Sequence, residues 1–201
     1  DEPGNGNLIK LIQLAGGHVV GIRRTADGPD LEDMKQHLAR HKVKAFFCNS
    51  TFHNPTGGTI SPRNAFGVLR LAVEHDFFVV EDDVYGDFSP GVRQTFAELD
   101  NLQRVIYIGS FSKCLSASLR VGYIACPPPL ATPLMRLTLL TCVAVPAVCE
   151  RFVNTILSDG TYARHMNDVQ QRLIHQPAHT PRVLLTHGSH LDISAAGRTS
   201  P

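Results

Sequence analysis

Few of the signals that mark specialised proteins occur in this sequence. Its 201 residues carry a formal net charge of +1 and contain no run of basic residues, so the electrostatic field that attracts nucleic acid or acidic membranes is missing. Apolar residues make up 43% of the chain and charged residues 18%, which is typical of a folded globular domain. We expect one core-forming domain, with no direct nucleic-acid contact by this chain.

The cysteine and histidine patterns exclude two kinds of site. The five cysteines are odd in number and none has CxxC spacing, which argues against a disulfide framework and against a zinc site. The ten histidines show no HExxH or similar spacing for a metal. Reduced and mostly buried thiols are typical of a cytoplasmic protein, and we predict that location.

Long apolar runs are also lacking. The chain opens with DEPGNGN, which has neither the basic start nor the apolar core of a signal peptide. The most apolar stretch, residues 134–153, is interrupted by Arg136 and Pro146 and never reaches the ~18 uninterrupted apolar residues of a membrane span. We interpret it as buried helix and predict no membrane association.

What the sequence does contain is an alternation of apolar strands and amphipathic helices. Apolar runs at 43–50, 77–83, 104–111 and 121–126 predict strands, and a shorter one is expected within 16–24. Helices are expected at 29–41, 61–76, 129–141, 146–159 and 161–173, with Asp30 and Ser61 as N-caps. Strands that are apolar throughout indicate a mostly parallel sheet covered on both faces, an α/β sandwich of three layers.

Polar residues gather where three of these strands end, in the segments 49–58, 81–87 and 110–120. Sites in such sheets form at the carboxyl ends of the strands. The first segment contains Asn54-Pro55-Thr56-Gly57, in which the proline and glycine favour a tight turn and Asn54 would present its amide. The alternative is a plain turn leading into the next helix.

The second segment contains Asp82 and Tyr85. A carboxylate directly after a buried strand is costly to desolvate unless it is paired. Asp82 could hold a cationic ring nitrogen, and Tyr85 could donate to a phenolic oxygen. A solvated acidic turn, or a magnesium-binding pair, is the alternative.

The third segment contains Ser110, Ser112, Lys113 and Arg120. A lysine beside a sheet can be partly desolvated, which lowers its pKa and frees the amine to form a Schiff base. The hydroxyls and the guanidinium could bind a phosphate. A surface lysine and a structural arginine are the alternative. Together, the three segments meet the needs of an aldehyde, a phosphate, a phenolic oxygen and a ring nitrogen, which belong to one cofactor, pyridoxal 5'-phosphate (PLP).

In order and spacing these motifs resemble the class I/II aminotransferases, the fold-type I PLP enzymes. The resemblance runs from residue 1 to about 173 and is carried by NPTGG, EDDVYGDF and GSFSKCLSASLRVGYI. The amino-acid sequences of these motifs are most similar to those of aminoadipate/kynurenine-type aminotransferases and of MocR-type regulators of the GntR family. In those regulators an aminotransferase-like domain follows a winged-helix DNA-binding domain.

The resemblance implies the following roles. Lys113 forms the Schiff base and moves a proton between substrate and cofactor, and Asp82 pairs with the pyridinium nitrogen. Tyr85 and Asn54 hydrogen-bond the phenolic oxygen. Ser110, Ser112 and Arg120 bind the phosphate. The substrates would be an amino acid and a 2-oxo acid, and full-length relatives would be homodimeric.

The resemblance also implies that residues 1–173 are an incomplete large domain. Residues 174–201 are atypical for the family, with Pro177, Pro181 and four histidines, and a frameshifted or disordered tail is our hypothesis there. Three functions stay open: a PLP-dependent aminotransferase, a non-catalytic sensor of PLP or an effector in a MocR-type regulator, and an inactive gene fragment.

Overall fold

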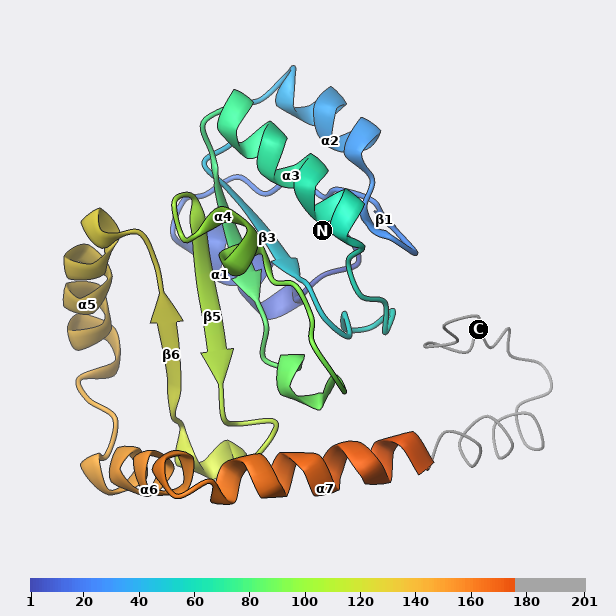
Figure 1. Cartoon of the computed structure of the whole chain (residues 1–201). Helices are drawn as coiled ribbons and strands as arrows, with labels where there is room; N and C mark the ends of the chain where they lie inside the picture. Colours follow the sequence, from blue (N-terminus) through green and yellow to red (C-terminus); the bar gives the residue numbers. More distant parts are fainter. Residues whose placement is uncertain (176–201) are drawn as a thin grey trace, which may run out of the picture.

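A four-stranded sheet forms the centre of the computed structural model, which describes residues 1–175 (Figure 1). The strand order is β3-β4-β5-β6, with bounds Ala45–Asn49, Phe78–Asp82, Val105–Ser110 and Gly122–Ala125. β3, β4 and β5 are parallel, and β6 runs antiparallel to β5. The predicted α/β fold with a mostly parallel sheet is confirmed.

Seven α-helices accompany the sheet in the described residues: α1 Gly6–Leu14, α2 Leu31–Leu38, α3 Pro62–Glu74, α4 Phe96–Asp100, α5 Pro128–Cys142, α6 Ala147–Ser158 and α7 Thr161–His175. Both predicted N-caps are confirmed, because the side chains of Asp30 and Ser61 accept hydrogen bonds from backbone amides in the first turns of α2 and α3. Short 3₁₀ turns, η1 and η2, span Gly86–Phe88 and Ala117–Leu119.

Two small elements differ from the prediction. Only Arg24 of the strand expected within 16–24 is in a strand, in the two-stranded ribbon of β1 (Arg24–Thr25) and β2 (Gly28–Pro29). The rest lacks a partner strand, apart from one bridge between Glu2 and Arg23. The five-residue helix α4 was not predicted, since it is too short to show a period.

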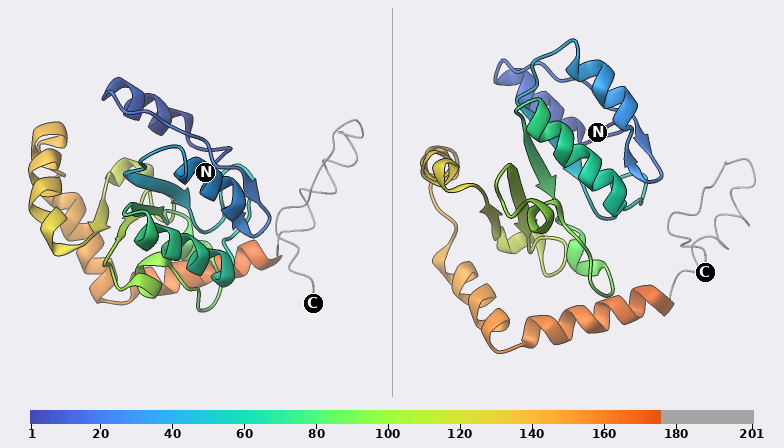
Figure 2. Two further views of the ribbon diagram at one scale, coloured as in Figure 1. Left: turned by 90° about the horizontal axis from the view of Figure 1, so that it is seen from above. Right: turned by 45° about the horizontal axis from the view of Figure 1, so that its top comes forward.

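The main core lies between the sheet and the helices on one face. α3 and α4 cover that face, and α1 lies on the other (Figures 1 and 2). Val68 of α3, Val79 of β4 and Val105 of β5 are fully buried. β3, β4 and β5 each contain buried residues, whereas β6 at the edge contains none.

A second, smaller core lies at the carboxyl end of the parallel strands. α6 and α7 run across that end of the sheet (Figure 1). Phe111 and Cys114, which follow β5, are buried there against Val153 of α6 and Met166 of α7. The segment predicted to be atypical, residues 174–201, lies outside the described residues apart from its first two positions.

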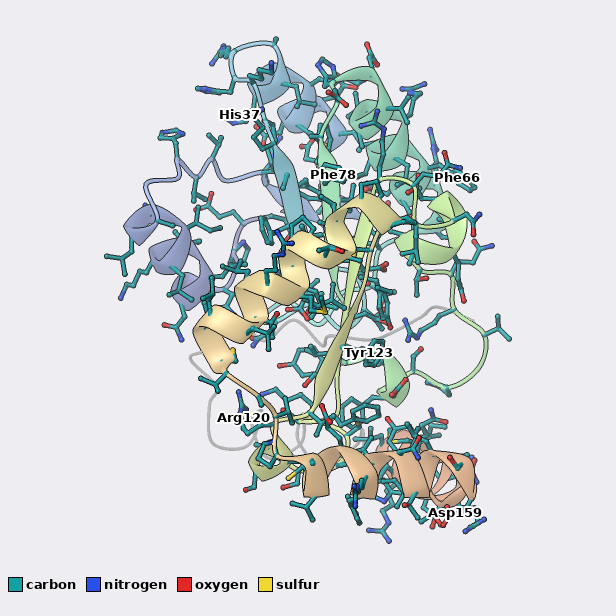
Figure 3. The ribbon with its side chains drawn as sticks, turned by 90° about the vertical axis from the view of Figure 1, so that its left-hand side faces the viewer. His37, Phe66, Phe78, Arg120, Tyr123 and Asp159 are labelled. Atoms are coloured by element: carbon teal, nitrogen blue, oxygen red, sulfur yellow. The ribbon has the colours of Figure 1, made fainter. Side chains whose placement is uncertain are left out.

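The interpretation of residues 134–153 as buried helix is wrong for the part that lies in α5, whereas Val153 of α6 is buried. α5 contains no buried residue, and Leu140 is 84% exposed. The reason is its position, since α5 stands beyond the edge strand β6 instead of covering a face of the sheet (Figures 1 and 3). Among the described residues, no helix is both long enough and apolar enough to cross a membrane.

Candidate functional site

The carboxyl ends of β3, β4 and β5 bring the three polar segments to one edge of the sheet. Asn49 ends β3 and lies in register with Asp82, which ends β4, while Asp82 pairs with Ile108 of β5. Ser110 ends β5 two residues later. The arrangement follows from the parallel register, which places successive strand ends side by side.

Neighbouring acids at the end of β4 point to opposite sides, as the alternation of a strand requires. Glu81 is fully buried and accepts hydrogen bonds from the amides of Phe96 (3.1 Å) and Ala97 (3.0 Å) at the start of α4. Burial raises the pKa of Glu81 even though these amides oppose the shift. Sequence reasoning missed this residue, which holds the start of α4 against the face of the sheet that α3 also covers.

Asp83 lies on the same side as Glu81. Its carboxylate pairs with Arg93 and accepts a hydrogen bond of 2.6 Å from the hydroxyl of Tyr107. Burial and this carboxylate raise the pKa of Tyr107. Asp82 and Asp83 therefore do not form a joint acidic pair, and the magnesium-binding alternative has no geometric basis.

Asp82 faces the candidate site. Within residues 1–175 its carboxylate has one hydrogen-bond partner, the amide of Val84 at 3.3 Å. Burial raises the pKa of Asp82, with a smaller contribution from the charge of Asp83, while the Val84 amide and the Lys113 ammonium act in the opposite direction. A half-buried carboxylate with so little compensation favours a cationic partner.

The turn that carries Asn54 is tied to β4 by a residue the sequence reasoning missed. The side-chain amide of Asn49 donates to the carbonyl of Asp82 (2.6 Å), and its oxygen accepts from the amide of Asn54 (3.2 Å). Asn54 itself is exposed, and its bond to Pro55 is cis. The signal available in the sequence was an asparagine at the last position of a buried strand.

A cluster of buried polar side chains, Asp1, Arg24 and His53, stabilises the turn that carries Asn54. Arg24 pairs with the carboxylate of Asp1 and donates to the carbonyls of Asn49 (3.2 Å) and Gly58 (3.4 Å). His53, 2% exposed, hydrogen-bonds through Nδ1 to the hydroxyl of Thr56 (2.8 Å). Burial, followed by the charges of Arg24 and of the chain's first ammonium, lowers the pKa of His53 to about 4.

Tyr85 is half-buried and directly precedes the η1 turn. Its hydroxyl has no hydrogen-bond partner in the described part of the chain, so it remains able to donate to a bound group.

The turn after β5 contains an internal hydrogen bond. The hydroxyl of Ser110 accepts from the amide of Ser112 (3.2 Å). Lys113 is exposed, so the expected desolvation does not occur, because the residue stands on an open turn at the edge of the sheet. Its ammonium is nevertheless near enough to act on the ionisation of Asp82.

No hydrogen bond or ion pair within residues 1–175 joins Arg120 to the other predicted site residues. It is exposed and has left-handed backbone geometry (φ 53°), and its guanidinium reaches only the Ala117 carbonyl (3.4 Å) among the described residues (Figure 3).

The fold, an incomplete α/β domain with a mostly parallel sheet, is that of the fold-type I aminotransferases. The chain matches the family model "Aminotransferase class I and II" over residues 1–182. It therefore belongs to that family.

Similar sequences divide between enzymes and regulators. The chain is 28% identical over 166 residues to the 2-aminoadipate transaminase of Thermus thermophilus, covering 80% of this chain and 42% of that protein. It is 26% identical over 188 residues to the HTH-type transcriptional regulator YcxD of Bacillus subtilis, covering 93% and 42%. It is 28% identical over 173 residues to the probable rhizopine catabolism regulatory protein MocR of Rhizobium meliloti, covering 85% and 34%.

Solved structures agree on the fold. LysN, the α-aminoadipate aminotransferase of Thermus thermophilus, superposes with a TM-score of 0.85 at 25% identity, covering 92% of this chain and 48% of that one. The multiple substrate aminotransferase of Thermococcus profundus gives 0.85 at 23% identity, covering 92% and 47%. The chain thus spans half or less of the length of these relatives.

Proposed function

We propose that this chain is the PLP-binding part of an aminotransferase-like protein, with Lys113 as the residue that bonds to the cofactor. The observation that carries the proposal is the placement of Asp82 and of the turn with Lys113 at the ends of the adjacent parallel strands β4 and β5. There the lysine charge acts on a half-buried carboxylate that has one hydrogen-bond partner within residues 1–175. The LysN structure is described as a complex with N-(5'-phosphopyridoxyl)-L-leucine, which supports the same cofactor here.

The residues present fit the cofactor's chemical groups. Asp82 offers a carboxylate for a protonated ring nitrogen, and Tyr85 and Asn54 offer donors for a phenolic oxygen. Ser110, Ser112 and Arg120 offer hydroxyls and a guanidinium for a phosphate, once the exposed Arg120 side chain turns toward them. When bound, the cofactor supplies an electron sink that stabilises negative charge on a substrate carbon.

Each group of the chain then has a defined task. Asp82 keeps the ring nitrogen protonated, because its own charge is poorly neutralised without that partner. Lys113 is exposed and has no ion-pair partner within residues 1–175, so its Nζ is free to hold the cofactor and to accept or return a proton. We expect an amino acid and a 2-oxo acid as substrates, and a homodimeric full-length protein.

PLP titration tests the proposal. The wild-type chain, Lys113→Ala and the matched control Lys10→Ala, an exposed lysine of α1, are titrated with PLP, reduced with borohydride and digested. The wild type and Lys10→Ala should show a visible absorbance band and a pyridoxyl group on the peptide that contains Lys113. A band that persists in Lys113→Ala, or a label spread over other lysines, would refute the role of Lys113.

A second candidate is favoured by the similarity to YcxD and MocR. In this candidate the same site holds PLP and senses an amino compound without transferring its amine. Amino acids are added to the PLP-loaded chain, and release of the matching 2-oxo acid is measured. Product in amounts stoichiometric with bound PLP supports the enzyme. A spectral change without product supports the sensor.

A further inference from the structure

Helix α7 contacts the two turns that carry the candidate site residues. It lies across the carboxyl end of the sheet (Figure 1), beside the η1 turn that follows Tyr85 and beside the turn that carries Lys113. These turns belong to different strands and are not adjacent in the sequence. One side chain of α7, Tyr162, forms hydrogen bonds with both turns.

The contacts of Tyr162 are specific. Its hydroxyl donates to the carboxylate of Asp87 in the η1 turn and lies 3.1 Å from the sulfur of Cys114. Its ring meets Phe111 edge to face, with the centroids 5.6 Å apart. Phe111 and Cys114 flank Ser112 and Lys113, so the tyrosine holds both sides of the lysine turn.

The proton count fixes the direction of these bonds. A phenol has one proton, and the carboxylate is the stronger acceptor, so the tyrosine donates to Asp87. The thiol of Cys114 can then donate its proton to the carbonyl oxygen of Ser110, which lies 3.5 Å from the sulfur. The tyrosine oxygen is the alternative acceptor. Burial raises the pKa of the Cys114 thiol, which keeps this proton in place.

Other residues of α7 hold one turn each. The amide of Gln170 donates to the carbonyls of Asp87 (2.8 Å) and Ser89 (3.2 Å). Nε2 of His165 lies 2.9 Å from the carbonyl of Cys114. Gln170 therefore hydrogen-bonds only to the η1 turn and the residue that follows it, and His165 hydrogen-bonds only to the lysine turn.

We propose that Tyr162 is a positioning residue that couples the turn carrying Lys113 to the turn following Tyr85, and so fixes the lysine relative to the groups around Asp82. The proposal deepens the proposed function and rests on it for its catalytic meaning. The coupling itself is a property of the chain without cofactor. None of the three motifs that carry the family resemblance contains Tyr162.

Amide hydrogen exchange of the chain without PLP tests the coupling. In Tyr162→Phe, which removes one oxygen atom, exchange should rise about threefold to tenfold in residues 86–89 and 111–116 together, the effect of one lost hydrogen bond. The control Tyr123→Phe keeps a ring whose centroid lies 6.0 Å from that of Phe111 and removes only a hydroxyl that has no hydrogen-bond partner within residues 1–175, so it should alter neither turn. Gln170→Ala should raise exchange in residues 86–89 alone.

Two results overturn the proposal. In one, only one turn responds to Tyr162→Phe. In the other, exchange rises equally in β3, β4 and β5, which signals a general loss of stability. A second readout follows PLP affinity in the same variants, where Tyr162→Phe should weaken binding about threefold to tenfold and Tyr123→Phe should not. Failure of the wild type to bind PLP would refute the proposed function and leave the exchange result to decide the coupling.

Discussion

Replacing His53 by glutamine should remove a measurable part of the acid sensitivity of this chain. His53 is buried directly before Asn54, beside Arg24, and its pKa is lowered to about 4 from an ordinary 6.5. The unfolded chain therefore binds a proton near pH 6.5, whereas the folded chain resists it. The stability contributed by neutral His53 is complete above about pH 6.5 and is lost as the pH falls toward 4.

The magnitude follows from these two pKa values. Between pH 8 and pH 5, a single group with these values lowers the free energy of unfolding by about 2 kcal/mol. One oxygen of the Asp1 carboxylate lies 3.6 Å from Nε2 of His53 and would stabilise the imidazolium in part. We therefore expect about 1 to 2 kcal/mol.

Urea unfolding at pH 8, 6.5 and 5 measures the effect. In the wild type this contribution should shift the midpoint by about 0.5–1 M at a slope of ~2 kcal/mol per M. In His53→Gln the shift between pH 8 and pH 5 should be smaller by that amount. The control His75→Gln, at the exposed C-cap of α3, should keep the wild-type dependence. An unchanged pH dependence in His53→Gln would show that His53 is not held neutral.

Three further changes test other contacts by urea unfolding and PLP titration. Glu81→Gln places an NH₂ group against the two amides that start α4 and should cost about 1–3 kcal/mol of stability; an unaffected midpoint would refute the buried cap. Asn49→Ala releases the Asn54 turn from β4 and should weaken PLP binding about tenfold with a smaller loss of stability; unchanged affinity would separate this turn from the cofactor. Arg93→Met leaves the buried Asp83 with one partner and should cost about 1–3 kcal/mol; equal stability to the wild type would contradict the pairing.

The parts of the fold with a regular period could be predicted from the sequence. α3 has an N-cap at Ser61, a proline at its first position and apolar residues at helical spacing, and all three signals agree with the structure. The parallel strands could be predicted from their continuous apolar residues. α5 shows the limit of such reasoning, because apolar composition predicts a need for burial and does not identify the surface that meets it.

The candidate site was predictable only in part, for a related reason. Asp82 and Lys113 follow apolar runs, so the strand pattern placed them at one edge. Asn49, Glu81 and Tyr162 act through partners far away in the sequence. Their residue types alone, even the asparagine at the end of an apolar strand, do not identify those partners. Such contacts depend on tertiary geometry, which a local pattern does not contain.

The bond between Asn49 and Asp82 has a consequence for the order of folding. It joins residues 33 positions apart, and the parallel pairing of β3 and β4 that aligns them requires the whole α3 crossover to close first. β5 and β6, in contrast, are antiparallel neighbours joined by residues 111–121, a shorter connection than residues 50–77 between β3 and β4. Contacts over long loops form slowly because loop closure costs entropy before it brings any stabilisation. We therefore expect the edge of the sheet that carries Asn54 to be completed after the β5–β6 hairpin. The ability to bind a ligand at that edge would then report on the last stage of folding, after strand signals in the spectrum have already appeared.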